Sequence, residues 1–148
     1  MRRLALALAA LALTSSAVYR APEPRIDRPR ERLTVYEAAV LGTSVPAALL
    51  RAVAIVESAE QDAAVGPDGL DLGRYQLREI FHAERAARWG EYNPHSAEAG
   101  HVAARVLEAN YLALGSWELA IAAYRQGVAG VRRDGPAEWY VERVRRQM

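Results

Sequence analysis

Apolar residues recur at helical spacing along most of the chain, most clearly between residues 46 and 58. The apolar positions there repeat with the period of a helix and form a wide stripe: Leu49, Leu50, Ala52, Val53, Ile55 and Val56. A helix with so wide an apolar surface is typically buried. We therefore expect a buried helix that runs directly into Glu57 and Ser58.

The same period predicts helices on both sides of this segment. They are expected from Thr34 to Gly42, at residues 78–89 and 96–114, from Trp117 to about Tyr124, and from Pro136 onward. Thr34 and Glu37 have the spacing of a capping box, and Ser116 can cap the helix that follows it. Gly127 and Gly130 are expected to break that helix, because glycine is a poor helix former.

The loop signals and the absence of a strand pattern decide the fold class. Residues 59–73 contain three glycines and a proline, and they predict an irregular loop. No segment shows the alternation with a period of two that is typical of a half-buried strand. The predicted fold class is therefore mainly α.

The first 33 residues show two other patterns. Residues 1–17 combine a basic start, ten consecutive Leu and Ala residues, and small residues at positions 15 and 17, in the order of a secretory signal. The apolar run is shorter than the ~20 residues of a membrane-spanning helix, and an uncleaved N-terminal anchor is the alternative. Residues 18–33 contain three prolines and five arginines, which predict an extended linker. We expect an exported protein, periplasmic or cell-wall associated, with its folded domain at residues 34–148.

Composition narrows the function classes. The chain has 148 residues and no cysteine, which fits one domain and excludes a disulfide framework, a cysteine nucleophile and a thiolate metal site. Its 19 basic residues, all arginine, and 18 acidic residues leave a net charge of +1, which gives no support for a nucleic-acid binder. His82, His95 and His101 lack the close spacing of metal ligands, so no metal and no other cofactor is expected.

Glu57 is the residue with the clearest chemical meaning. A carboxyl group at the end of a buried helix, followed by a glycine-rich loop, is poorly solvated. Desolvation raises the pKa of a carboxyl, which suits a general acid near neutral pH. Taken alone, the position favours an ordinary exposed glutamate at a helix end over a catalytic one, because most glutamates are exposed.

Four segments favour the catalytic reading of Glu57. They resemble motifs of the lytic transglycosylases of the lysozyme superfamily, and they occur in the same order along the chain. They are VPAALLRAVAIVES at residues 45–58, DLGRYQL at 71–77, LAIAAYRQGVAGV at 119–131 and WYVERV at 139–144. The resemblance is to the soluble and secretion-associated type and covers roughly residues 40–147. It implies a small, lysozyme-like helical domain of the goose-type lysozyme and transglycosylase kind.

The resemblance also implies an activity. Such enzymes cleave the β-1,4 bond between N-acetylmuramic acid (MurNAc) and N-acetylglucosamine (GlcNAc) of peptidoglycan and form a 1,6-anhydro-MurNAc end. A single glutamate does this without water, metal or cofactor, and Glu57 matches it. The implied substrate-binding residues are Ser58, Tyr75, Gln76, Tyr124, Arg125 and Tyr140.

These residues have different implied roles. Gln76 matches the glutamine that lines the sugar groove, Tyr124 a tyrosine near the reacting N-acetyl group, and Tyr140 a tyrosine that approaches the catalytic glutamate. Tyr75 stands where the family commonly has methionine, and it either packs on a sugar or belongs to the core. Ser58 is expected to fix the helix end rather than act as a nucleophile, since no base is spaced for it.

Two positions depart from the family pattern. Arg125 replaces the usual asparagine after Tyr124, and Gly66 stands where a serine often occurs. An arginine beside Glu57 would lower the pKa of that carboxyl, so we expect Arg125 to point to solvent or to pair with another acidic residue. Two alternatives stay open: a non-catalytic peptidoglycan-binding or assembly protein on the same fold, and a hydrolytic lysozyme that uses Glu57 with Asp71.

The implied partner is the peptidoglycan glycan strand. A small domain without a wall-anchoring module suits a local task beside a secretion, pilus or flagellar assembly, and equally general wall turnover or phage lysis. No nucleic acid is expected as a partner, and the chain is expected to be a monomer.

Overall fold

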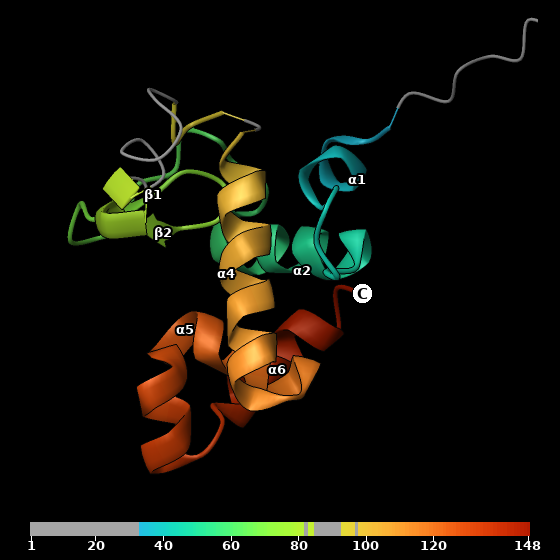
Figure 1. The fold of residues 1–148 in the computed structure, drawn as a ribbon. Coiled ribbons are helices and arrows are strands. Elements are labelled where there is room, and N and C mark those ends of the chain that lie inside the picture. The colour runs from blue at the N-terminus through green and yellow to red at the C-terminus, as the bar shows by residue number, and fades with distance from the viewer. Residues whose placement is uncertain (1–32, 82, 85–92, 97) are drawn as a thin grey trace, which may run out of the picture. The chain divides into compact units, whose positions relative to one another are not determined.

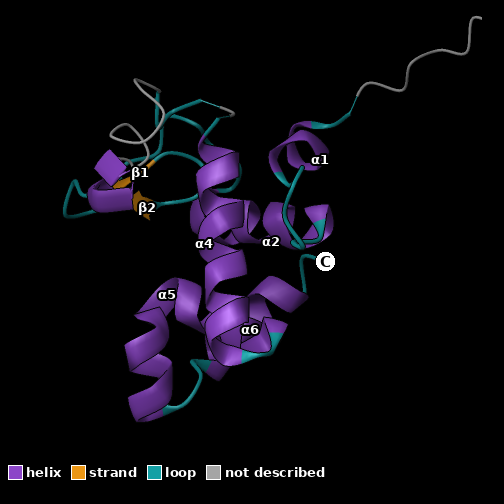
Figure 2. Cartoon of the chain, in the orientation of Figure 1, coloured by secondary structure: helices purple, strands orange, loops and turns teal. Residues whose placement is uncertain are grey.

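The computed structural model describes residues 33–81, 83–84, 93–96 and 98–148 (Figure 1). Its elements are α1 (Val35–Ala39), α2 (Ala47–Ser58), β1 (Asp71–Leu72), β2 (Leu77–Arg78), α4 (Ala99–Leu114), α5 (Trp117–Asp134) and α6 (Glu138–Arg145). Helices make up most of the described chain (Figure 2), which confirms the predicted fold class. The expected signal segment and nearly all of the expected linker lie outside the described residues. Within those residues, no helix is long and apolar enough to cross a membrane.

Helix α2 lies in the middle of the core. Leu49, Leu50 and Val53 are at most 1% exposed, and the helix packs against α1, α4 and α6. Its wide apolar stripe is needed because several neighbours cover it at once. Ala59, in a left-handed conformation with φ 53°, ends the helix directly after Ser58. Glu57 therefore lies in the last turn, as the sequence predicted.

A small hairpin follows in the glycine-rich segment. Strand β1 pairs antiparallel with β2, with Leu72 opposite Leu77. The prediction of an irregular loop over residues 59–73 is therefore wrong near its end, where the first strand lies. Gly73 begins the turn with φ 72°, and a Cβ there would lie 2.3 Å from the carbonyl oxygen of Pro94. Only glycine allows this conformation and this close approach together.

The C-terminal half was predicted well except at one glycine. Ser116 caps α5 by accepting a hydrogen bond from the backbone N–H of Leu119 at 3.2 Å. Gly127 interrupts the helical backbone with φ 74° and ψ 158°, as expected, and the two halves meet at a kink. Gly130 does not break the helix, which continues to Asp134. Gly130 is buried, and a Cβ at this position would lie 3.3 Å from the Cβ and Cγ of Gln126, which is a tight contact.

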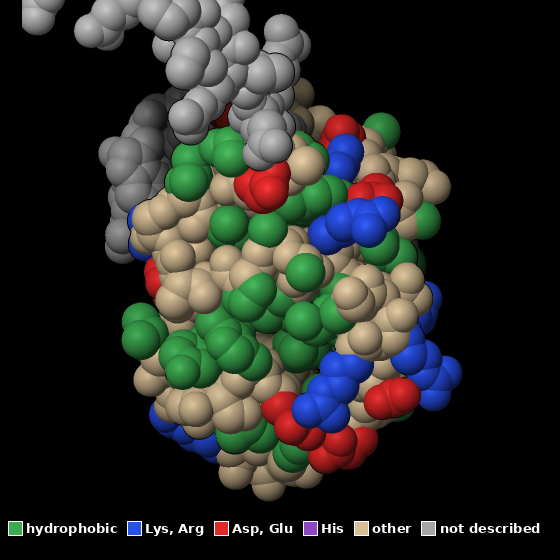
Figure 3. Space-filling model, turned by 90° about the vertical axis from the view of Figure 1, so that its right-hand side faces the viewer, with side chains coloured by type: hydrophobic (Ala, Val, Ile, Leu, Met, Phe, Trp, Pro, Cys, Tyr) green, Lys and Arg blue, Asp and Glu red, His purple; other side chains and the backbone are tan. Residues whose placement is uncertain are grey.

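Surface charge is largely paired. Arg145 lies 2.9 Å from Glu118, and Arg146 lies 2.9 Å from Glu142. Figure 3 shows one face on which basic and acidic side chains lie next to one another at the edges of a central group of hydrophobic side chains. Exposed pairs of this kind contribute ~0–1 kcal/mol each, so they balance charge more than they hold the fold together.

Candidate active site

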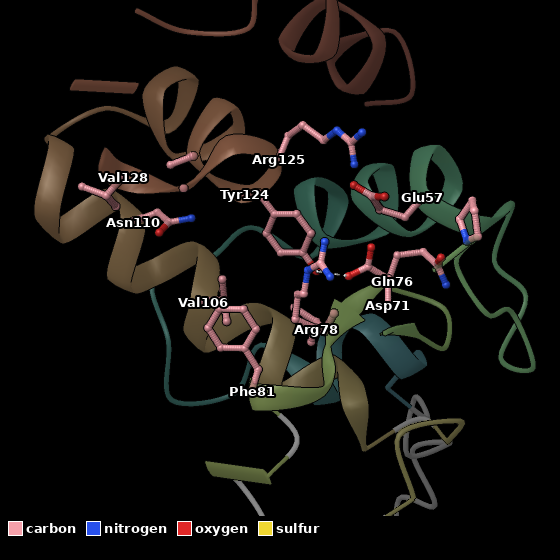
Figure 4. Close-up of a pocket in the computed structure, with 14 residues that line it drawn as sticks. Glu57, Asp71, Gln76, Arg78, Phe81, Val106, Asn110, Tyr124, Arg125 and Val128 are labelled. Carbon is pink, nitrogen blue, oxygen red and sulfur yellow. Dashed lines mark ion pairs between the residues drawn. The ribbon is translucent and has the colours of Figure 1, made fainter. Parts of the chain in front are cut away.

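A pocket of about 530 Å³ lies where the end of α2, the hairpin, α4 and α5 meet. Charged, amide and phenol side chains and a few apolar ones line it (Figure 4). The main lining residues are Glu57, Asp71, Gln76, Arg78, Phe81, Val106, Asn110, Tyr124, Arg125 and Val128. The pocket thus brings together residues from four elements that are far apart in the sequence.

Glu57 projects from the last turn of α2 into this pocket, and Tyr140 on α6 donates a hydrogen bond to its Oε1. Burial raises the pKa of Glu57. The Tyr140 hydrogen bond and the charges of Arg125 and Arg143 lower this pKa, while the negative charge of Asp71 raises it, and burial dominates. Glu57 is therefore a carboxyl that keeps its proton to a higher pH than an exposed glutamate, which suits proton donation.

Tyr140 and Tyr124 stay protonated donors beside this carboxyl. Tyr140 is 2% exposed, and burial together with the nearby Glu57 carboxyl raises its pKa far above the usual tyrosine range. Tyr124 lines the pocket and donates to the carbonyl oxygen of Tyr75 at 2.9 Å. Burial also raises the pKa of Tyr124 well above its usual value. Tyr124 therefore ties α5 to the turn of the hairpin at the pocket wall.

Tyr75 and Ser58 do not line the pocket. The Tyr75 side chain is fully buried, so of the two expectations for this residue the structure shows the core tyrosine, and packing on a sugar is ruled out by burial. The Ser58 hydroxyl donates to the carbonyl oxygen of Arg74 at 2.7 Å and accepts from the backbone N–H of Gln61 at 3.0 Å. Ser58 thus joins the end of α2 to the hairpin turn, and its hydroxyl is engaged on both sides.

Gln76 lines the pocket in a left-handed conformation with φ 45°. Its amide nitrogen donates to the carbonyl oxygen of Gly73 at 2.9 Å, which fixes the side chain across the turn. A Cβ at Gly66 would lie 3.0 Å from the Asp71 Cβ and 3.2 Å from the Gln76 Oε1. A serine at this position would therefore press on the hairpin, which accounts for glycine here.

Arg125 is exposed at the rim of the pocket. It extends toward the end of α2 in Figure 4, and its charge acts on Glu57. Among the described residues it forms no ion pair and no hydrogen bond. Arg125 thus faces the pocket and Glu57, the arrangement that the sequence analysis did not favour, although its side chain is also exposed to solvent.

Asp71 lies on β1 at the opposite wall. Its Oδ1 is 3.4 Å from the Nε of Arg78, which also lies 2.9 Å from Asp68. The Asp71 carboxylate is therefore held by a cation rather than directed at Glu57 alone. This arrangement gives Asp71 a role in shaping the charge of the pocket and does not favour it as a second catalytic carboxylate.

A cluster on the other side of the α2 end was missed from the sequence. In this Arg74 cluster, the Arg74 guanidinium donates to both carboxylate oxygens of Asp62, at 2.8 and 3.1 Å, and to the Tyr36 hydroxyl at 2.9 Å. Tyr36 in turn donates to Glu60. No pattern in the sequence marks this cluster, because its members lie on separate elements. The cluster joins α1, the end of α2 and the hairpin turn.

The histidines have no shared site in the described chain. His95 Nδ1 lies 2.8 Å from the carbonyl oxygen of Asp62, His101 is exposed on α4, and His82 lies outside the described residues. The residues that the structure describes contain no group of three or more His, Cys, Asp or Glu side chains that could hold a metal ion.

Comparison with known proteins agrees with this geometry. A family model described as the Transglycosylase SLT domain matches residues 35–138, more than half of the chain. The match includes Glu57 and the pocket residues of the hairpin, α4 and α5, while Tyr140 follows just after its end. Neither curated proteins nor solved structures gave a match.

Proposed function

Because this chain belongs to the Transglycosylase SLT domain family, we propose that it is a peptidoglycan lytic transglycosylase with Glu57 as its single catalytic residue. Family membership supports a transglycosylase-type function in general. One observation carries the finer proposal: Glu57, with a raised pKa, lines an open pocket while a buried tyrosine holds its carboxyl.

In the first step, Glu57 acts as a general acid. Its proton moves to the glycosidic oxygen between MurNAc and GlcNAc, the bond from that oxygen to the MurNAc C1 breaks, and the GlcNAc leaves as an alcohol. The positive charge at C1 is taken up by the N-acetyl oxygen of the same sugar, the substrate-assisted route. Burial supports this step because it keeps Glu57 protonated.

In the second step, the Glu57 carboxylate acts as a base. It takes the proton of the MurNAc C6 hydroxyl while that oxygen attacks C1 and displaces the N-acetyl oxygen. The 1,6-anhydro ring closes, Glu57 regains its proton, and no water is consumed. The Tyr140 hydrogen bond and the charge of Arg125 favour the ionised carboxyl, so they support the charge that Glu57 carries between the two steps.

Other residues of the pocket have supporting roles in this proposal. Tyr124 lines the pocket with its hydroxyl anchored to the hairpin, and we assign it to the N-acetyl group. Gln76 presents its amide oxygen in the same wall, where it can accept from a sugar hydroxyl or N-acetyl N–H.

The hydrolytic alternative requires a second carboxylate that activates water. Asp71 is the available candidate, and its carboxylate lies 3.4 Å from the Nε of Arg78 instead of standing free to activate water. The non-catalytic alternative rests on Arg125, whose charge lowers the pKa of Glu57. Burial raises the pKa by more than that charge lowers it, so the arginine does not by itself prevent Glu57 from acting as a general acid.

Digestion of purified peptidoglycan in ¹⁸O-labelled water separates the three functions. The proposal expects 1,6-anhydro products without label, detected by mass spectrometry. Reducing ends that carry the label would indicate a lysozyme, and no product from wild-type protein would indicate a binding protein. Glu57→Gln is the control, and products that persist at the wild-type level in this variant would contradict Glu57 as the single catalytic residue.

We also propose that the chain is exported and works at the cell wall, with cleavage after Ala17. Residues 1–17 carry the signal pattern, and a task beside a secretion, pilus or flagellar assembly fits a small domain of this kind. Mass spectrometry of the exported protein tests this. A start near Val18 is expected, and a full-length product held at the membrane would contradict it.

A further inference from the structure

The charges of the pocket do not balance once Glu57 carries its proton. Four charged side chains line it: Glu57, Asp71, Arg78 and Arg125. Among these four, Arg78 pairs with Asp71 at 3.4 Å, and its other partner, Asp68 at 2.9 Å, does not line the pocket. Arg125 has no acidic partner among the described residues. With a protonated Glu57, the pocket therefore carries one positive charge that its own walls do not compensate.

We propose that Arg125 binds a carboxylate of the substrate next to the bond that is cut, so that the pocket selects anionic glycan strands over neutral ones. This inference rests on the proposed function, because it takes the peptidoglycan strand as the substrate. A guanidinium suits the role, since its planar donors match a carboxylate in a bidentate contact.

The position of Arg125 supports a contact near the reacting sugar. Arg125 follows Tyr124 on α5 and shares the pocket with Glu57, and its charge acts on the Glu57 carboxyl. The MurNAc whose glycosidic oxygen Glu57 would protonate also carries a lactyl group, on the O3 atom of the same ring. A cation close to Glu57 is therefore within range of substituents on that sugar.

Two parts of peptidoglycan offer the same chemistry. In a strand without stem peptide, the lactyl group ends in a free carboxylate. In a substituted strand this carboxyl is an amide, and the nearest carboxylates belong to the peptide. Both sources present a carboxylate to the guanidinium, and a neutral strand presents none.

A simpler role for Arg125 has to be separated from this one. Arg125 could act only through its charge on Glu57, which would change all substrates alike. Arg143 is the matched control, because its charge also lowers the pKa of Glu57, yet it does not line the pocket. A preference that depends on Arg125 and not on Arg143 therefore reports a substrate contact.

Binding to the Glu57→Gln protein tests the inference without cleavage of the ligand. Three fragments of equal length are compared by calorimetry: peptide-free strands, the same strands with the lactyl carboxyl converted to a methylamide, and strands with stem peptides. Each is measured with the Glu57→Gln protein alone and with Arg125→Gln or Arg143→Gln added. Circular dichroism checks that each variant is folded.

We expect at least one anionic fragment to bind about tenfold more tightly than the neutral one, the lower end of what a hydrogen bond to a charged group contributes. The fragment that shows the preference identifies the source of the carboxylate. Arg125→Gln should abolish the preference and Arg143→Gln should keep it. Equal binding of all three fragments, a preference that survives Arg125→Gln, or binding of none would overturn the inference. The proposed function fails on a different result, the absence of anhydro products from wild-type protein.

Discussion

Two glutamates at the C-terminal end of α2 accept a hydrogen bond from a tyrosine, but their surroundings differ. Glu57 accepts from Tyr140 and lines the pocket. Glu60 accepts from Tyr36, and the guanidinium of Arg51 lies 3.5 Å away. Glu60 therefore belongs to a network of paired charges, whereas Glu57 has no ion pair among the described residues.

The difference shows what makes one of two similar carboxyls a candidate acid. The tyrosine contact is common to both, so it does not distinguish them. Burial without a cation in contact does, because it favours the neutral form of a carboxyl. The cations near Glu57, Arg125 and Arg143, act on its pKa through their charge without an ion pair. They moderate the raised pKa and do not cancel it.

The largest expected effect comes from replacing Glu57 itself and comparing the result with the same change at Glu60. Glu57→Gln keeps the shape and removes the proton, so the rate of peptidoglycan cleavage should fall by about 10²–10⁴-fold, the usual contribution of a general acid. Glu60→Gln, three positions further along the chain, should stay within about threefold of wild type, because its side chain does not line the pocket. Release of soluble fragments measures both. Equal losses in the two variants would mean that Glu57 is not the acid.

Replacing the tyrosine that donates to each glutamate tests whether the two pairs differ in function. Tyr140→Phe removes the donor to Glu57, and we expect about a tenfold loss of rate, or ~1.4 kcal/mol in barrier. Because that hydrogen bond lowers the pKa of Glu57, the fall in rate at high pH should move to higher pH. Tyr36→Phe instead leaves Arg74 and Glu60 short of a partner. It should lower the free energy of unfolding by ~1–3 kcal/mol without moving the pH profile.

Rates across pH and denaturant titrations measure these two variants. If Tyr36→Phe moved the pH profile as far as Tyr140→Phe does, the two pairs would be one coupled network.

Periodicity predicted α2 and the position of Glu57 because a buried helix needs an apolar stripe on several sides. It did not predict the hairpin, since strands of two residues are too short for an alternating pattern. The prediction that Gly130 breaks the helix rested on propensity alone, and α5 continues through this buried position to Asp134. Burial by distant residues likewise places Tyr75 in the core, which its own position in the sequence did not show.

Contacts between distant residues explain the rest of what the sequence could not supply. Arg74 binds partners 12 and 38 positions away, and no local pattern marks them. Tyr140 reaches Glu57 across 83 positions, and its place beside the acid came from the family resemblance and not from spacing. The exposure of Arg125 at the pocket rim depends likewise on how α5 meets the end of α2.

The charges near Glu57 should move its titration in opposite directions. A general acid works only when protonated, so the rate falls as pH rises through its pKa. Arg125→Gln and Arg143→Gln each remove a charge that lowers this pKa, so the fall should occur at higher pH. Asp71→Asn removes a charge that raises it, so the fall should occur at lower pH. At the optimum we expect changes below about tenfold, or ~1.4 kcal/mol.

Rate profiles measured on one substrate at constant ionic strength check this prediction. A shift of the same sign in the Arg125 and Asp71 variants would show that another group controls the profile.

The smallest effect concerns stability. The folded state raises the pKa of Glu57, so this group contributes stability below its unfolded pKa and loses it as pH rises through the folded pKa. Gln at this position carries no charge at any pH and avoids that loss. The free energy of unfolding of Glu57→Gln should therefore rise relative to wild type as pH rises from acidic to neutral, by about 0.5–2 kcal/mol, the usual gain from relieving one unfavourable site. Glu60→Gln removes a partner of Tyr36 and Arg51, so it should show no such gain. Thermal unfolding of the three proteins across this pH range decides the matter, and a constant difference between wild type and Glu57→Gln would mean that Glu57 does not titrate in that range.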